Sequence, residues 1–441
     1  MPSNRKKRPI AVDLFAGAGG MTLGFEQAGF DVLASVEIDP IHCATHQFNF
    51  PKCSILCKDV ALLTGAEIRK NSPIGKRQID VVISGSPCQG FSMMGKRDVD
   101  DPRNSLIFHF QRLVLELKPK FFVMENVPGI KAGEHKELLH LLISSFIASG
   151  YQVEENYQVL NSAHYGVPQA RKRLFLLGSK AGFELPKYPP PITLLPKLNQ
   201  KIAPSQRKRK GKNNPDLPLV PTVMEAIGDL PEVELYSELL YRDWVMAEYG
   251  KSSDYASIMR GIDASDDDYS YPREYDRQIL SSSWRTKHSQ ECIERFRAAK
   301  HGEKEPISRF YKLHPDGVCN TLRAGTDRAR GAYTSPRPIH PIAPRCITVR
   351  EAARLHSYPD WFRFHVTKWH GFRQVGNSVP PLLAKAVAAQ IIRALGVQVI
   401  KPTAKLTWGD DGLLKLNWLE AEKYYQNRDY QNRGGEESPR L

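Results

Sequence analysis

The sequence predicts an α/β protein built on a doubly wound, mostly parallel sheet, with a second, smaller and irregular domain. Three observations support this fold class. Short apolar runs alternate with helix-length segments over the first 180 residues, a glycine-rich turn follows the first run, and the alternation stops near residue 181, where prolines and basic residues accumulate. Strands that alternate with helices form parallel sheets covered on both faces. A chain of 441 residues is long enough for two domains.

The expected elements of the first part follow from these runs. Strands are expected at 10–15, 32–36, 79–84, 121–124 and 174–177, and helices at 21–28, 106–117, 136–148 and 381–395. We therefore expect a first domain over 1–180, completed by 375–400. A second domain is expected over 181–374, and a peripheral polar tail over 401–441.

The charge balance favours a polyanionic partner. The chain has 62 Lys and Arg against 48 Asp and Glu, a net charge of +14. Neutralising phosphates releases condensed counterions, so a surplus of this size is typical of nucleic-acid binding, although a generally basic enzyme is an alternative. The basic run at 206–212 is either a solvated loop or a phosphate contact.

The seven cysteines are scattered, which is typical of a reducing compartment. Cys53 and Cys57 lie close in sequence, but no second Cys/His pair follows at zinc-finger spacing, so no metal site is expected. No apolar run approaches the roughly 20 residues that span a bilayer. The basic residues 5–8 resemble a signal peptide only briefly, because Asp13 and its glycines follow. We expect a soluble, cytoplasmic protein.

A cofactor pocket is expected after the first strand, in the Asp-Leu-Phe-Ala-Gly-Ala-Gly-Gly segment 13–20. Gly17 and Gly19 let the backbone turn and bring a ligand close to a helix N-terminus. Glu37 ends the second strand, where an acid can accept from ribose hydroxyls, and Asp59 follows the third, where it can accept from an adenine amino group. These residues favour S-adenosylmethionine over a dinucleotide, because neither a G-x-G-x-x-G nor a P-loop lysine is present. The alternative is that the two acids only cap helices.

A nucleophile is expected after the fourth strand, in Gly-Ser-Pro-Cys-Gln-Gly-Phe-Ser at 85–92. Ligands of doubly wound sheets collect at the carboxyl ends of strands, which places Cys88 in the cleft. Its Ser, Gln and Gly neighbours are poor core residues and argue against a buried structural cysteine. Glu125 ends the fifth strand, where it can hydrogen-bond a nucleobase ring nitrogen as a neutral acid or exchange a proton with it.

Two arginines precede the last apolar strand. Alternation places Arg171 and Arg173 on one face, from which both guanidinium groups can reach a base carbonyl or a phosphate. A solvated surface is the alternative for strand arginines taken alone.

Together these residues resemble the cytosine-carbon-5 DNA methyltransferase family. The resemblance covers residues 10–395 and rests on six blocks in the family's order: 13–20, 87–89, 125–127, 169–173, 350–355 and 376–379. The stretch from 181 to about 340 carries no family motif, except that residues 321–325 are a candidate for one. In enzymes of this family, the corresponding stretch recognises the target sequence.

The resemblance implies a Rossmann-like methyltransferase that flips a cytosine out of double-stranded DNA. Cys88 would attack ring carbon 6 and Glu125 would engage ring nitrogen 3, after which carbon 5 accepts the methyl group of S-adenosylmethionine. Arg173 would hold the base carbonyl, and Arg171 would help to order the Cys88 loop. The residues implied for the cofactor are Phe15, Gly17, Gly19, Glu37, Ile38, Asp59, Val60, Pro87, Asn377 and Ser378.

Two features extend this comparison. Many family members have an aromatic residue where this chain has Ile38, so a hydrophobic contact replaces adenine stacking there. Asn377 lies far along the chain, which implies that the C-terminal helix packs back onto the first domain. By analogy, the resemblance also implies a monomeric bacterial or phage modification enzyme, with a separate cognate restriction endonuclease as a candidate partner.

Two other functions remain open at this point. One is a tRNA cytosine-5 methyltransferase on the same scaffold, against which the long basic insert argues. The other is an inactive DNA-binding relative, against which the presence of Cys88, Glu125 and Arg173 argues.

Overall fold

The computed structural model describes residues 8–86, 106–196, 198, 216–326 and 337–432. At its centre is an eight-stranded sheet in the order β3-β2-β1-β4-β5-β9-β6, with β7 also paired to β9. The first five strands are mutually parallel: β1 (Ile10–Leu14), β2 (Asp31–Glu37), β3 (Ser54–Cys57), β4 (Val81–Ser84) and β5 (Phe121–Asn126). The strand order reverses at β1, which confirms the predicted doubly wound sheet.

The far edge of the sheet is antiparallel. β9 (Lys172–Lys180) runs against β5, and both β6 (Tyr151–Val153) and β7 (Gln158–Asn161) run against β9. The sequence predicted only the apolar centre of β9. It missed β6 and β7 because they are short and partly polar, with alternate side chains in solvent. No helix crosses between them, so neighbouring strands reverse direction.

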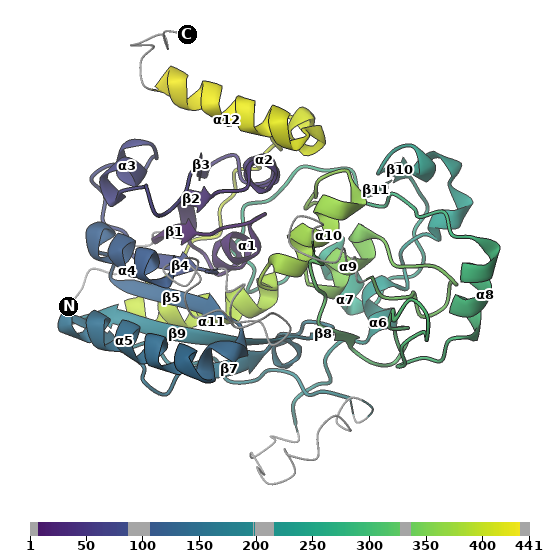
Figure 1. Cartoon of the computed structure of the whole chain (residues 1–441), viewed down its shortest axis with the longest axis horizontal. Helices are drawn as coiled ribbons and strands as arrows, with labels where there is room; N and C mark the ends of the chain where they lie inside the picture. Colours follow the sequence, from purple (N-terminus) through teal and green to yellow (C-terminus); the bar gives the residue numbers. More distant parts are fainter. Residues whose placement is uncertain (1–7, 87–105, 197, 199–215, 327–336, 433–441) are drawn as a thin grey trace.

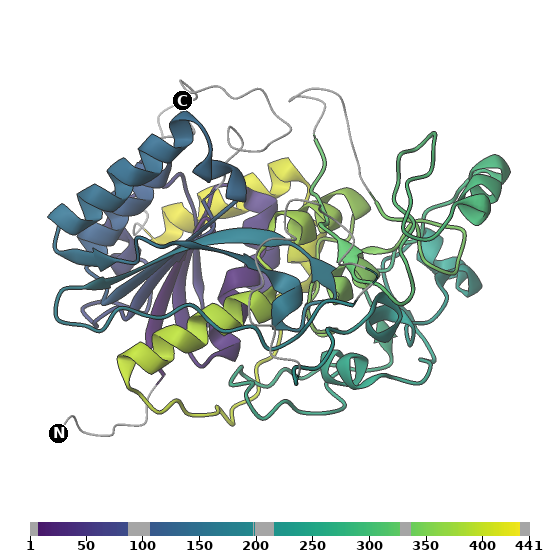
Figure 2. The ribbon, with the colours of Figure 1, turned by 90° about the horizontal axis from the view of Figure 1, so that it is seen from below.

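Helices cover both faces of the sheet (Figures 1 and 2). α1 (Gly20–Gln27) and α11 (Pro381–Leu395) cover one face, and α3 (Gly65–Lys70), α4 (Leu106–Leu117) and α5 (Glu134–Ala148) cover the other. Successive residues of a strand point to opposite faces. Ala11 accordingly packs into the core beside α1, whereas Val12 packs into the core beside α4.

The last long core helix returns to the start of the chain. A Cβ atom placed on Gly24 of α1 would lie 2.5 Å from the Ala384 Cβ atom of α11, so the two helices approach more closely than any other residue allows. Within the described ranges, one helical stretch, Lys368–Leu395, has the length and composition of a membrane span. It consists of α10 (Lys368–Asn377) followed by α11, and α11 is a core helix packed on α1.

Residues 216–320 form an irregular region beside the sheet, drawn in teal and green in Figure 1. Its elements are α6 (Val223–Ile227), α7 (Asp254–Met259), α8 (Gln290–Ala298) and the antiparallel pair of β10 (Val245–Met246) and β11 (Ile279–Leu280). β12 (Cys319–Asn320) pairs in parallel with β8 (Gln169–Ala170). Short 3-10 helices occur at Pro128–Lys131, Ser162–Tyr165, Val233–Leu235, Ser237–Leu240 and Asp411–Lys415.

α9 (Val349–Leu355) carries one of the six sequence blocks and joins the irregular region to the core. Ala352, Ala353 and Leu355 are buried in the same core as α1 and α11. The guanidinium group of Arg354 is fully buried and donates to the carboxylates of Asp360 and Asp229, the second at 3.2 Å. The block is therefore a structural junction, and the domain boundaries expected from the sequence remain a prediction.

The described part of the expected tail forms a helix. α12 (Trp418–Asn432) packs against α2 (Pro40–Asn49), where Tyr425 and Leu414 are buried with Ala44 and Phe48. The apolar side chains explain why this polar segment is held against the sheet domain.

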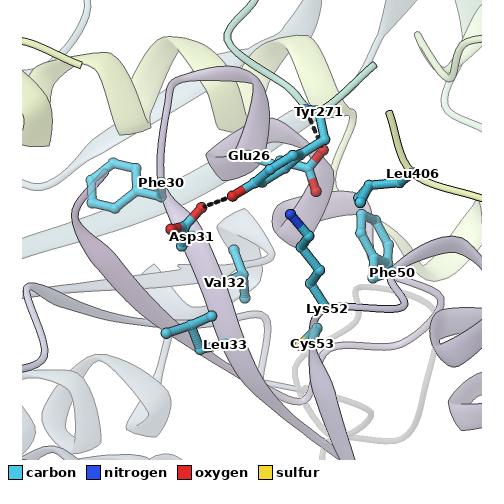
Figure 3. Close-up of a pocket in the computed structure, with 10 residues that line it drawn as sticks. All are labelled: Glu26, Phe30, Asp31, Val32, Leu33, Phe50, Lys52, Cys53, Tyr271 and Leu406. Carbon is cyan, nitrogen blue, oxygen red and sulfur yellow. Dashed lines mark hydrogen bonds between the residues drawn. The ribbon is translucent and has the colours of Figure 1, made fainter. Parts of the chain in front are cut away.

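A small cavity of about 50 Å³ marks the amino-terminal edge of β2, where the irregular region is tied to the sheet (Figure 3). The Tyr271 hydroxyl donates to Asp31 Oδ1 at 2.9 Å, and its peptide nitrogen donates to Glu26 Oε1 at 3.1 Å. The ammonium group of Lys52 lies 3.9 Å from the centroid of the Tyr271 ring. Since Asp31 begins β2, this cavity lies at the opposite end of the strand from the ligand-binding edge.

Candidate active site

The turn between β1 and α1, at the carboxyl edge of the sheet, is sharp. Phe15, Gly17 and Gly19 all have positive φ angles, of 61°, 55° and 103°. A Cβ atom on Gly19 would lie 2.3 Å from the ring of Phe50, whereas one on Gly17 would have no neighbour within 4 Å. Gly19 is therefore required for packing, while Gly17 leaves the backbone open to an incoming ligand.

The Glu37 carboxylate lies against this turn. Its Oε2 atom accepts from the Gly17 peptide nitrogen at 2.8 Å, and its Oε1 atom accepts from the Ile38 and Asp39 nitrogens at 2.9 Å each. The side chain of Ile38 beside it is 63% exposed. Asp39, with its side chain accepting from the Ile41 nitrogen, is the residue that caps α2. Glu37 is thus fixed at the end of β2 without serving as a helix cap.

Asp59 follows β3 at the same edge. It is half-buried and accepts from the Ala61 nitrogen at 2.9 Å, while Val60 is buried. α3 is capped by Thr64, so Asp59 does not cap that helix either. Glu37 and Cys57 are register partners across β2 and β3, which places both acids along one edge.

The far end of the chain reaches this edge, as the sequence predicts. A Cβ atom on Gly20 would lie 2.5 Å from the Val379 carbonyl oxygen and 2.9 Å from the Ser378 Cβ atom. Asn377 is exposed at the end of α10, and the Ser378 hydroxyl donates to the Val375 carbonyl at 2.8 Å. The open turn, the two acids and an exposed apolar side chain fit an adenosine-containing ligand.

A buried polar group that sequence inspection missed lies under the turn. The Thr22 hydroxyl donates to Asp13 Oδ2 at 2.7 Å and lies 3.0 Å from His46 Nε2. Burial raises the pKa of Asp13 to about 7 and lowers the pKa of His46 to about 3. Between these values Asp13 is protonated and His46 is neutral, so the network under the turn carries no charge.

Glu125 lies at the end of β5 and faces the chain that leaves β4. Its Oε1 atom lies 2.7 Å from the Nε atom of Arg173 on β9. A Cβ atom on Gly85 would lie 3.7 Å from Glu125 Oε2. Burial raises the pKa of Glu125, against the opposing effect of Arg173 and Arg171. Pro87 and Cys88 lie outside the described residues, two and three positions after Gly85.

Arg171 lies near Arg173 and Glu125, but its guanidinium group does not extend outward to a base carbonyl or a phosphate as the sequence predicts. Its guanidinium group is buried and donates to the carbonyl oxygens of Leu322 and Gly376, at 2.8 Å each. That prediction was wrong because two backbone carbonyls from distant parts of the chain occupy the guanidinium group. Arg173 makes the close ion pair with Glu125, and Arg171 lies near enough to lower the pKa of that carboxyl group as well.

The comparisons identify the family. The sequence profile of the C-5 cytosine-specific DNA methylase family matches residues 10–393. The chain belongs to this family. This C-5 cytosine-specific DNA methylase is 54% identical over 414 residues to the type II methyltransferase M.XorII of Xanthomonas oryzae pv. oryzae, covering 94% of this chain and 92% of that one. It is 32% identical to M.DdeI of Desulfomicrobium norvegicum, covering 86% and 88% of the two chains.

Solved structures agree with the fold of the C-5 cytosine-specific DNA methylase. A prophage-encoded DNA modification methyltransferase of E. coli has a TM-score of 0.67 and 33% identity, covering 88% of this chain and 99% of that one. The Dnmt2 methyltransferase of S. pombe has a TM-score of 0.50 at 16% identity and shares the fold alone. The protein is a DNA cytosine-5 methyltransferase, and its family implies S-adenosylmethionine as the methyl donor. Within the described ranges, no three His, Cys, Asp or Glu side chains gather as metal ligands would.

Proposed function

We propose that the enzyme methylates carbon 5 of a flipped-out cytosine in a specific double-stranded DNA sequence, through a covalent adduct of Cys88. The observation that carries this proposal is the Glu125–Arg173 pair, which lies 2.7 Å apart and faces Gly85, shortly before Cys88. A buried acid beside a cation, at the end of the strand next to the nucleophile loop, suits a polar base taken out of its stack.

Each of the three side chains has a separate role. The Cys88 thiolate forms a bond to ring carbon 6, and the electron pair of the ring's 5,6 double bond moves toward carbon 5 and the ring nitrogen. Glu125 holds a proton at its carboxyl group and shares it with ring nitrogen 3, because burial favours its neutral form. Arg173 donates to the base carbonyl. After methylation, loss of the carbon 5 proton expels the Cys88 thiolate.

The cofactor pocket is assigned to the residues around the glycine turn. Glu37 accepts from the ribose hydroxyls, Asp59 accepts from the adenine amino group, and Ile38 supplies an apolar contact. S-adenosylmethionine, when bound there, supplies an electrophilic methyl group at its sulfonium. Phe15, Gly17, Gly19, Val60, Pro87, Asn377 and Ser378 complete the proposed pocket.

We propose that residues 181 to about 340, which include the irregular region and belong to the expected second domain, recognise the target sequence. The similarity to type II methyltransferases favours a role in a restriction-modification system, with a separate cognate endonuclease. We propose that the enzyme acts as a cytoplasmic monomer on the bacterial chromosome. Exchanging residues 181–340 for those of a relative should change the sequence that is methylated, and unchanged specificity would place recognition elsewhere.

Bisulfite sequencing of genomic DNA from cells that express the protein tests the proposal most directly. Protected cytosines should occur in one sequence context, and duplexes carrying 5-fluorocytosine in that context should trap the enzyme covalently in the presence of S-adenosylmethionine. The tRNA alternative predicts label from the methyl donor in tRNA and none in DNA. The inactive-relative alternative predicts no adduct.

A further inference from the structure

The backbone of Leu322 is hydrogen-bonded on both sides by Gln169 and Arg171, which come just before β9. The Leu322 nitrogen donates to Gln169 Oε1 at 3.1 Å, and the Leu322 carbonyl accepts from Arg171 Nη1 at 2.8 Å. Both side chains are buried, with exposed fractions of 0% and 1%. The adjacent Thr321 hydroxyl donates to the Ala170 carbonyl at 2.8 Å, which extends the pairing of β12 with β8. The segment that leaves β12 is therefore held by specific bonds.

The same two side chains hold the segment that ends α10. Arg171 Nη2 donates to the Gly376 carbonyl at 2.8 Å. Gln169 Nε2 lies 2.9 Å from His356 Nδ1, and His356 Nε2 lies 3.1 Å from the Ser378 carbonyl. Burial, together with the nearby Arg171, lowers the pKa of His356 well below its usual range, so the ring is neutral. Because a carbonyl only accepts, Nε2 carries the ring proton and Nδ1 accepts from Gln169.

Two unbroken paths thus connect Leu322 with the Gly376–Ser378 backbone. One runs through Arg171 alone, and the other runs through Gln169 and His356. Between them the backbones are in direct contact, since a Cβ atom on Gly376 would lie 2.4 Å from the Ala324 nitrogen. Arg323, next to the Leu322 peptide, is exposed.

We propose that Gln169 and Arg171 are positioning residues that couple DNA binding at 321–325 to cofactor binding at Asn377 and Ser378. This proposal rests on the proposed recognition role of the irregular region and on the proposed cofactor role of Asn377. A buried hydrogen-bonded network resists partial displacement, so a shift of the Leu322 peptide moves the Gly376 carbonyl as well. Each ligand then strengthens binding of the other by the same factor.

The first experiment measures this factor. Isothermal titration calorimetry gives the dissociation constant of S-adenosylhomocysteine with and without a duplex that carries the sequence that the enzyme methylates. Wild type should bind at least about 5-fold more tightly in the presence of the duplex. Arg171→Lys keeps the charge but cannot reach two carbonyls, so it breaks one of the two paths and the factor should fall below that of wild type. Lys172→Ala, at the exposed neighbouring position, is the control and should keep the wild-type factor. A factor of one in wild type, or an unchanged factor in Arg171→Lys, overturns the proposal.

The second experiment needs no substitution and therefore does not depend on how a variant folds. Amide hydrogen exchange of the wild-type enzyme is followed with and without S-adenosylhomocysteine and no DNA. Peptides covering 319–325 should exchange more slowly when the cofactor product is bound, because the Leu322 amide is held by Gln169. Unchanged exchange in those peptides, together with protection at 376–379, overturns the coupling.

A scrambled duplex separates this inference from the proposed function. If recognition does not involve the irregular region, exchanging that region leaves the preference for the methylated sequence over the scrambled one unchanged. If only the coupling is wrong, wild type still prefers the methylated sequence, but Arg171→Lys has the same factor as wild type.

Discussion

Arg173 Nε and Glu125 Oε1 lie 2.7 Å apart across the antiparallel pair of β9 and β5, with side chains only 14% and 9% exposed. Two opposing effects act on the carboxyl group. Burial favours its neutral form, while the neighbouring guanidinium favours its charged form, and the net effect is a raised pKa. The burial of Glu125 and its pairing with Arg173 therefore determine the pH at which Glu125 loses its proton.

Arg173→Ala should extend the neutral form of Glu125 to higher pH. Removing Arg173 removes the largest of the effects that lower the pKa, so the pKa of Glu125 rises further. A group with a raised pKa holds its proton below that pKa and loses it above. The alkaline limb of the single-turnover rate should therefore move to higher pH. The rate itself should fall by roughly 10- to 100-fold, as expected for losing a charged hydrogen bond of about 1.5–3 kcal/mol. An alkaline limb that does not move would contradict this assignment.

Cys88→Ser should remove turnover while leaving cofactor binding nearly intact. Loss of a covalent nucleophile lowers the rate by about 10⁴-fold or more. The proposed cofactor residues lie mainly at the ends of β1, β2 and β3, so S-adenosylhomocysteine should bind within a few-fold of wild type. Cys292→Ser, on α8 of the irregular region, is the matched control and should stay active. Methylation by the Cys88 variant at the wild-type rate would refute the nucleophile assignment.

Asp13→Asn should change how stability depends on pH. Asp13 has a raised pKa of about 7, so folding takes up a proton above pH 4 and this contribution to stability falls as pH rises toward 7. His46 has a lowered pKa of about 3, so its contribution rises with pH up to about 6.5. In wild type the two contributions oppose each other between about pH 4 and 6.5. The variant keeps only that of His46.

The measurement is urea unfolding at several pH values between 4.5 and 6.5. Relative to wild type, the free energy of unfolding of Asp13→Asn should rise by about 1.4 kcal/mol for each pH unit. Asp316→Asn, on an exposed loop, is the control. Parallel profiles for wild type and Asp13→Asn would mean that Asp13 is ionised in the folded enzyme.

Gly24→Ala should destabilise the fold from the interface of α1 and α11. The added Cβ atom would lie 2.5 Å from both the Ala384 Cβ atom and the Pro381 carbonyl oxygen, and such overpacking costs about 1–3 kcal/mol. In Gly250→Ala the nearest neighbour would lie at 3.5 Å, an ordinary contact, so this control should unfold like wild type. Chemical denaturation of both variants compares them. Equal midpoints would show that the two helices separate at little cost.

The sheet was largely predictable because its signal is local. The strands Val81–Ser84 and Phe121–Asn126 begin with uninterrupted apolar runs, and Glu37 and Glu125 lie at the ends of β2 and β5. The antiparallel edge of the sheet was not predictable from the sequence, because strand direction depends on long-range pairing rather than on a strand's own residues. The polar network of Asp13, Thr22 and His46 was also missed, because His46 lies on a helix with no motif around it.

Arg171 illustrates the limit of motif-based inference. The block 169–173 draws attention to Arg171, but its partners Leu322 and Gly376 lie far along the chain. No spacing rule relates residues so distant in sequence. The direction in which a buried guanidinium points is decided by the carbonyls that tertiary packing brings to it.

The contact between α1 and α11 has a consequence for how the protein is made. About 350 residues separate these helices in sequence. At translation rates of roughly 5–20 residues per second, the ribosome needs about 20–70 s to synthesise the partner of α1. During that time Leu23 and Phe25, which are fully buried in the finished enzyme, have no covering helix. The sheet domain is therefore completed only after α11 has been synthesised, and until then these exposed apolar side chains favour aggregation of the nascent chain.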